Sequence, residues 1–197
     1  MIKDNYESKS ERCLVESKFQ KAVEEAKGFN WTDEGRKKWG YVALTPGSTL
    51  TIKFDSSMPG RVNDPSISLR VAYLMSYANA GCATISCVQG CECKPVLLNT
   101  HNPNERLSLM KLHRMEITQS QECRMRFEVD KDSTSMNSTQ PYKVKILGIM
   151  VSEDPPQMAQ RHEWLDIHQP GDTDIHRDGL FVGRFMKLED LLSTSWS

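Results

Sequence analysis

A hydrophobic pattern with a period of two, repeated between residues 41 and 151, limits the fold of this chain more than any other feature. In one segment Leu50, Ile52 and Phe54 alternate with polar residues. The segments with this alternation or a β-rich composition are 41–44, 48–54, 65–77, 82–88, 95–100, 105–117, 122–129 and 142–151. Because successive side chains of a strand point to opposite faces, and turn residues separate these segments, the pattern predicts about eight strands.

The spacing of these segments indicates how the strands are connected. Little sequence with helical periodicity lies between them, so the long crossovers that parallel strands need are not expected. Two antiparallel sheets that bury each other's apolar faces satisfy the pattern. We therefore predict an all-β fold, an antiparallel β-sandwich of jelly-roll type, over residues 28–151. Within its last segment the alternation shifts phase near Gly148.

The ends of the chain differ from this middle part. Residues 10–27 carry Phe19 and other apolar residues at helical spacing, with Ser10 as a candidate N-cap and Gly28 as a stop. We expect an amphipathic helix there, within an N-terminal segment 1–27, packed on the edge of a sheet. Residues 152–197 are polar and rich in histidine and proline, and we expect a polar tail with one short helix.

Composition excludes some classes of function and raises a question of compartment. The net charge of −1 predicts no general attraction to nucleic acid or to an anionic membrane. No apolar run approaches the roughly 20 residues that span a bilayer, and the first residues carry no leader. Six cysteines and the glycosylation sequons at Asn30 and Asn137 nevertheless favour the secretory pathway or the extracellular space. A missing leader or upstream domain reconciles these signals; a cytoplasmic protein with free thiols is the alternative.

The cysteines are concentrated in one segment, because four of them lie within residues 82–93. Structural zinc prefers two pairs of ligands separated by a longer loop, and the Cys-x-Cys step at 91–93 matches this poorly. We favour disulfides over reduced thiols and over a metal site. The disulfide candidates are Cys13, Cys82, Cys87, Cys91, Cys93 and Cys123.

The positions of the cysteines suggest partners without fixing them. A turn at Gly90 would bring Cys87 close to Cys93. Cys123 lies on a later predicted strand, within reach of Cys91 or Cys93. Cys13, on the predicted N-terminal helix, offers a tie between that helix and the sheet.

Three motifs resemble a known family. They are WGYVA at 39–43, YLMSY at 73–77 and CVQGCEC at 87–93. Over about residues 13–151 the chain resembles the β-rich region C-terminal to the catalytic domain in plant SGNH (GDSL-type) hydrolase-like proteins. The resemblance implies a secretory-pathway β-sandwich attached to an esterase-like domain, and a hydrolase domain of that type as a partner.

The catalytic motifs of that family do not occur in this sequence. SGNH enzymes need a Gly-Asp-Ser block and a later Asp-x-x-His block; the only Gly-Asp here is Gly171-Asp172, which Thr173 follows. We therefore assign no catalytic residue, metal or cofactor. A residual esterase acting on acylated carbohydrate, built around His113, is the alternative. The histidines of the tail, His162, His168 and His176, are weaker candidates for metal binding.

Glycan binding is the function that the remaining residues favour. β-Sandwich modules bind sugars through exposed aromatic rings, with acids and amides beside them. An aromatic and charged loop at 28–48 supplies such groups. The ligand-binding candidates are Trp31, Asp33, Glu34, Arg36, Trp39 and Tyr41. The alternative for each ring is a place in the core, and we expect that for Tyr73 and Tyr77.

Overall fold

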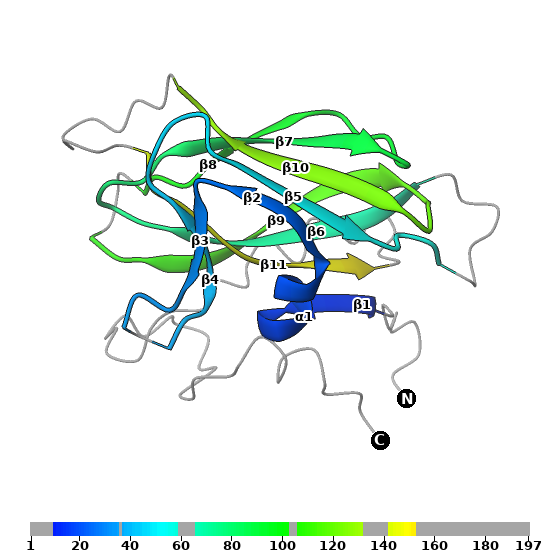
Figure 1. The fold of residues 1–197 in the computed structure, drawn as a ribbon, viewed down its shortest axis with the longest axis horizontal. Helices are drawn as coiled ribbons and strands as arrows, with labels where there is room; N and C mark the ends of the chain where they lie inside the picture. The colour runs from blue at the N-terminus through cyan, green and yellow to red at the C-terminus, as the bar shows by residue number, and fades with distance from the viewer. Residues whose placement is uncertain (1–9, 36, 59–65, 103–105, 132–141, 153–197) are drawn as a thin grey trace, which may run out of the picture.

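The structure is a computed structural model that describes residues 10–35, 37–58, 66–102, 106–131 and 142–152. These residues form two antiparallel sheets packed face to face, with one short helix at the side (Figure 1). The all-β sandwich predicted from the alternation is confirmed. No helix within these ranges is long and apolar enough to cross a membrane.

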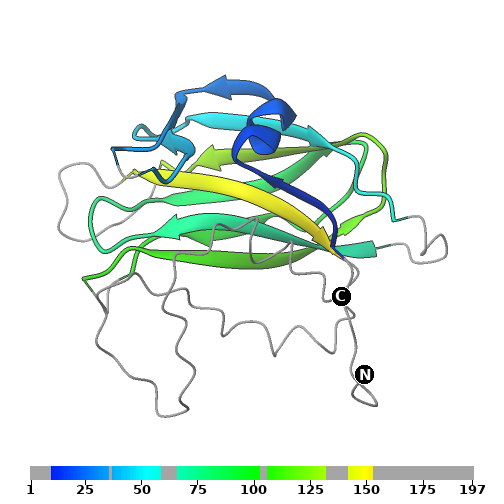
Figure 2. The ribbon, with the colours of Figure 1, turned by 90° about the horizontal axis from the view of Figure 1, so that it is seen from below.

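Sheet A contains six strands. Its order is β3 (Phe29–Thr32), β4 (Gly40–Ala43), β11 (Val144–Ser152), β6 (Ser66–Met75) and β9 (Leu109–Thr118), and β1 (Ser10–Val15) pairs with β11 beside β4. Sheet B contains five, in the order β2 (Val23–Lys27), β5 (Thr49–Phe54), β10 (Cys123–Val129), β7 (Cys82–Gln89) and β8 (Val96–Asn99). Helix α1 (Glu16–Ala22) joins the two sheets and contacts strands of both (Figure 2).

The core lies between the sheets and consists of the alternate apolar residues that the sequence pattern marks. From β5, Leu50 and Ile52 are fully buried, and from β10, Met125 and Phe127 are fully buried. Burial of each such side chain stabilises the fold by about 1.5–3 kcal/mol. All eight predicted strands are present at close to their predicted positions, because one face of each is buried and the register is therefore fixed.

Strand β11 contains the phase shift expected near Gly148. Its pairing with β6 runs from Ile146 opposite Tyr73 directly to Gly148 opposite Ala72, which is a β-bulge. As a result Ile146 and Ile149, three positions apart, both face the core. The bulge lets β11 follow β4 in its first half and β1 in its second.

The N-terminal helix predicted over 10–27 is wrong in its extent. Residues 10–15 form β1, 16–22 form α1, and 23–27 form β2. The helical spacing correctly predicts that Phe19 is buried, and it is fully buried in α1. The segments on either side of α1 instead pair with β11 and β5, because each of these strands has an edge whose backbone groups need hydrogen-bond partners. Pairing with those edges outweighs a helix propensity that is only a weak preference. Cys13 therefore lies on a strand, not on a helix.

Arg12 of β1 also ties the two sheets together. Its guanidinium donates to the carbonyl oxygens of Asp55 and Ser57, at 3.0 and 2.6 Å, and pairs with the Asp55 carboxylate at 2.6 Å. The residues it reaches follow β5 of sheet B. The predicted tail, 152–197, lies outside the described residues except for Ser152, which ends β11.

Candidate functional site

Aromatic rings form a column on the β3–β4 hairpin. Tyr41 packs edge-on against Phe19 of α1, with ring centroids 5.9 Å apart. Trp31 lies opposite Tyr41 across the hairpin, with centroids 5.0 Å apart. Trp39 stacks on Trp31 at 5.9 Å, with an angle of 17° between the planes. The column begins in the core and ends at Trp39, whose side chain is 43% exposed.

The three aromatic residues predicted to bind a ligand differ in their exposure within this column. Trp31 and Trp39 lie together at the surface end. Tyr41 is only 7% exposed, so it supports Trp31 from below and does not present a ring to a ligand. Its position on the inward face of β4, two residues from the buried Ala43, accounts for this. Burial also raises the pKa of the Tyr41 phenol.

The loop between β3 and β4 is held by local hydrogen bonds. The Gly35 amide donates to Asp33 Oδ1 at 2.9 Å, and the Glu34 amide donates to Thr32 Oγ1 at 3.1 Å. Glu34 has a φ of 52°, a left-handed conformation that such side-chain contacts help to hold. The loop therefore holds two of the predicted acids, Asp33 and Glu34, in the connection between Trp31 and Trp39. Arg36 lies outside the described residues.

Glu34 also pairs with two lysines more than 100 residues away. Its carboxylate accepts hydrogen bonds from Lys143 and, at 2.9 Å, from Lys145. The Lys145 side chain is only 2% exposed. Partial burial alone would raise the pKa of Glu34, but these hydrogen bonds and the lysine charges lower it below its ordinary value of 4.5. These two ion pairs of Glu34 fix the loop to the start of β11.

Replacing Glu34 with glutamine is expected to lower the free energy of unfolding at pH 7 by about 2 kcal/mol, because the buried Lys145 ammonium loses its carboxylate. A fully buried pair would cost more, but the Glu34 side chain is 30% exposed. Since folding lowers the pKa of Glu34, its contribution is present above pH 4.5 and is lost as the pH falls through the folded pKa. Urea unfolding at pH 7 and pH 3.5 should show the difference between the two proteins shrinking in acid.

Glu92→Gln is the matched control for this prediction, since Glu92 is exposed and its carboxylate forms no ion pair among the described residues. It should change stability little at either pH. If the free energies of unfolding of Glu34→Gln and the parent differ by the same amount at both pH values, the role given to the carboxylate charge is contradicted.

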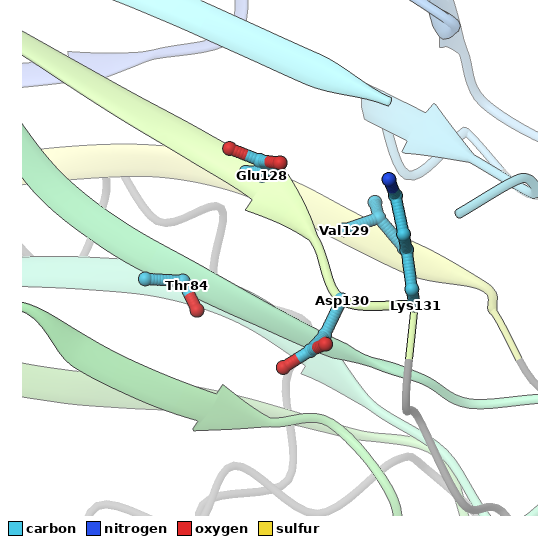
Figure 3. A pocket seen from close by; sticks show the side chains of 5 residues that line it. All are labelled: Thr84, Glu128, Val129, Asp130 and Lys131. Atoms are coloured by element: carbon cyan, nitrogen blue, oxygen red, sulfur yellow. The ribbon is translucent and has the colours of Figure 1, made fainter. Parts of the chain in front are cut away.

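A shallow pocket lies elsewhere, at the end of β10. It has a volume of about 390 Å³ and is lined by Thr84 of β7, by Glu128 and Val129 of β10, and by Asp130 and Lys131, which follow β10 (Figure 3). Glu128 is exposed, and Val129 is fully buried. The pocket is polar and lacks the aromatic wall of the hairpin surface.

The cysteine segment forms two disulfides, as expected from its composition. Cys87 bonds to Cys93 across a turn in which Gly90 has a φ of 79°. Cys91 bonds to Cys123 at the start of β10. The sulfurs of Cys87, Cys91 and Cys123 lie within 4.8 Å of one another, but all three belong to these disulfides. Cys13 and Cys82 take part in neither bond, so the disulfide suggested between Cys13 and the sheet is not formed.

Other candidate residues are dispersed. Tyr73 is buried at 8%, as expected, but Tyr77 is 48% exposed, because it lies beyond the end of β6. Burial lowers the pKa of His113, and no hydrogen bond joins it to a serine or an acid within the described part of the chain. Asn30 is exposed on β3, and Asn137 lies outside the described residues, as do the histidines of the tail.

The fold has counterparts among solved structures. The chain superposes on a two-domain esterase active on acetylated mannans, solved with mannopentaose, with a TM-score of 0.52 and 13% identity. The match covers 74% of this chain and 38% of the esterase. A second structure of a two-domain esterase active on acetylated mannans matches with a TM-score of 0.49 and 15% identity, covering 74% and 37%. A β-1,3-glucan binding module, a CBM6 from Bacillus halodurans, covers 76% of this chain and 96% of its own, with a TM-score of 0.37 and 10% identity.

These similarities are structural. At 13% identity, the match to the esterase shows a shared sandwich fold. The chain spans less than two fifths of that esterase. No known protein family matches the chain, and neither does any characterised protein sequence.

Sequence reasoning missed the polar groups around the pocket. Thr84 and Glu128 are the polar positions that alternate with the core residues of β7 and β10. The alternation that reveals the core also identifies this opposite face. What the sequence lacks is the pairing of β7 with β10, which brings residues about 44 positions apart directly opposite each other.

Proposed function

We propose that this chain is a glycan-binding β-sandwich and that Trp39, stacked on Trp31, is the platform for a sugar ring. The observation that carries the proposal is the exposure of Trp39 at the end of an aromatic column in which Trp31 is partly buried and Tyr41 is buried. An isolated surface tryptophan is mobile, but stacking on Trp31 fixes the ring plane before a ligand arrives. Such preorganisation reduces the entropy cost of binding.

The surroundings of Trp39 suit a sugar. The apolar face of a pyranose packs on an aromatic ring, while its hydroxyls need hydrogen-bond partners at the rim. Asp33 is only partly exposed, and its carboxylate uses one oxygen to accept from Gly35. A carboxylate offers about four lone-pair sites, so capacity remains for sugar hydroxyls. The ion pairs of Glu34 hold this loop in place.

Replacing Trp39 with alanine is expected to weaken glycan binding about tenfold or more, because the ring supplies the central stacking contact. Isothermal titration should compare mannopentaose with oligosaccharides identified on an array of cell-wall polysaccharides. Mannopentaose is included because the esterase of similar fold was crystallised with it.

Tyr77→Ala is the matched control for Trp39→Ala. Tyr77 is an aromatic residue of similar exposure, 48% against 43% for Trp39, but it follows β6 and lies outside the hairpin. It should leave affinity unchanged. Absence of binding to every glycan on the array, or equal losses in both variants, would refute the Trp39 surface.

A second role, packing against an SGNH-type hydrolase domain, has support of its own. The chain matches 38% of an esterase described as having two domains, and its sequence resembles a region next to such catalytic domains. Co-expression with an SGNH-type domain tests this. Co-elution of the two on gel filtration supports the role, and separate elution excludes it.

We also propose that the chain folds in an oxidising compartment. The two disulfides support this, because such bonds persist outside the cytosol. Denatured native material should take up alkylating label at two cysteines before reduction and at all six after it. Labelling of all six without reduction would favour the cytoplasm.

A further inference from the structure

The outer face of sheet B carries a compact group of polar side chains, here called the polar face. It occupies the three central strands β5, β10 and β7. Its members are Thr49, Thr51, Thr84, Ser86, Arg126 and Glu128. Arg126 lies opposite Thr51 on one side and Ser86 on the other; Glu128 lies opposite Thr49 and Thr84. Side chains directly opposite one another share a face, so the six form two adjacent rows.

Two members of the polar face have unmet hydrogen-bonding capacity. Arg126 Nε is buried and has no hydrogen-bond partner among the described residues. Thr51, which is 7% exposed, has a buried hydroxyl that forms no hydrogen bond within the part of the chain that the structure describes. These two residues are cross-strand neighbours. A buried donor without a partner costs free energy, so the adjacency of two such groups indicates a place for a polar ligand.

The neighbouring acids do not neutralise Arg126. Arg124 pairs with Glu24 at 2.8 Å, Lys53 with Glu122 at 2.6 Å and Lys27 with Glu25 at 2.8 Å. Among the described residues, no carboxylate forms an ion pair with Arg126. These three cations are therefore paired with acids, whereas neither Arg126 nor Glu128, in adjacent rows of the polar face, forms an ion pair among the described residues, and the Arg126 charge remains for an anion from outside the chain.

The pocket at the end of β10 adjoins the polar face. Thr84 and Glu128 belong to both, and Asp130 and Lys131 extend the pocket beyond the strand (Figure 3). Adjacent strands lie about 4.8 Å apart, close to the width of a sugar ring. A ring that lies over β10 would have the row of Thr51, Arg126 and Ser86 at one end and the row of Thr49, Glu128 and Thr84 at the other.

We propose that the polar face binds a uronic acid residue of an acidic glycan, with Arg126 and Thr51 holding its carboxylate and Glu128 and Thr84 contacting its hydroxyls. A planar guanidinium matches a carboxylate through two parallel hydrogen bonds, and a neutral sugar would leave that charge unpaired. The inference rests on the proposed function, that the chain binds glycans, but it uses a surface separate from Trp39.

The test compares two ligands that differ only at their carboxyl groups. Trigalacturonic acid and its methyl ester present the same ring hydroxyls, and only the acid carries carboxylates. Titration of the full chain should show about tenfold or tighter binding of the acid. Arg126→Gln should abolish that preference. Arg124→Gln is the control: it removes the arginine two residues before Arg126 on β10, which is already paired with Glu24, and it should retain the preference for the acid.

Further measurements distinguish a uronic acid site from a general anion site and from glycan binding at Trp39. Equal binding of acid and ester, or a preference retained in Arg126→Gln, would overturn it. Competition by acetate alone at the concentration of the glycan would show a general anion site and would also overturn it. Trp39→Ala should keep the ratio of acid to ester affinity. If the chain binds neutral glycans through Trp39 and shows no preference for the acid, the proposed function holds and only this inference is refuted.

Discussion

Replacing both Cys91 and Cys123 with alanine is expected to lower the free energy of unfolding by about 3.7 kcal/mol, the largest effect predicted for this chain. The disulfide joins residues 32 apart, with Cα atoms separated by 4.9 Å. It ties the turn after β7 to the start of β10, and both side chains are buried. The loss arises mainly because the unfolded chain regains the freedom of a large loop. Guanidinium unfolding of the oxidised parent and the double variant measures it.

The second disulfide provides an internal comparison. Cys87 and Cys93 are only 6 residues apart, so the same loop-entropy argument gives about 2.2 kcal/mol for their joint replacement by alanine. The two double variants should therefore differ by about 1.5 kcal/mol under identical conditions. Equal losses would contradict the loop argument and place the stabilisation in local packing instead.

Much of the sandwich was predictable because it depends on a local pattern. Residues such as Leu50, Ile52 and Phe127 reveal their burial through alternation alone. The disulfide between Cys87 and Cys93 was within reach for a similar reason, since Gly90 marks the turn between them. The N-terminal segment was misread because its apolar spacing fits a helix, while its structure is decided by edges of β11 and β5 that lie far away in sequence.

The candidate surfaces were only partly predictable. The sequence placed Trp31 and Trp39 in one loop region but gave no sign that the rings stack or that Tyr41 lies beneath them. The partners of Glu34 are 109 and 111 residues away and depend on the position of β11 in sheet A. The polar face arises the same way, from the order in which β5, β10 and β7 pair. Long-range strand order is set by the balance of many contacts, and no short motif encodes it.

Gly148→Ala is expected to destabilise the chain by about 3 kcal/mol, at the upper end of the cost of overpacking. A Cβ at this position would lie 2.4 Å from the carbonyl oxygen of Leu14 and 2.8 Å from a methyl group of Val15. The nearest atom belongs to the backbone of β1, which pairs with β11 there, so relief requires moving one strand away from the other. The bulge at Gly148 thus serves two purposes, because it resets the phase of β11 and lets β1 approach closely.

Gly35→Ala separates this steric cost from the cost of backbone conformation. Gly35 has a φ of 75°, and a Cβ there would meet no atom within 4 Å, so its replacement should cost about 1 kcal/mol. Gly148 is not among the residues with positive φ, so its loss comes from the contact with β1. Urea unfolding ranks the two variants, and hydrogen exchange of the β1 amides should increase selectively in Gly148→Ala. If Gly148→Ala loses no more stability than Gly35→Ala and its β1 amides stay protected from exchange, the predicted displacement of β1 is wrong, because β11 then accommodates the added methyl group.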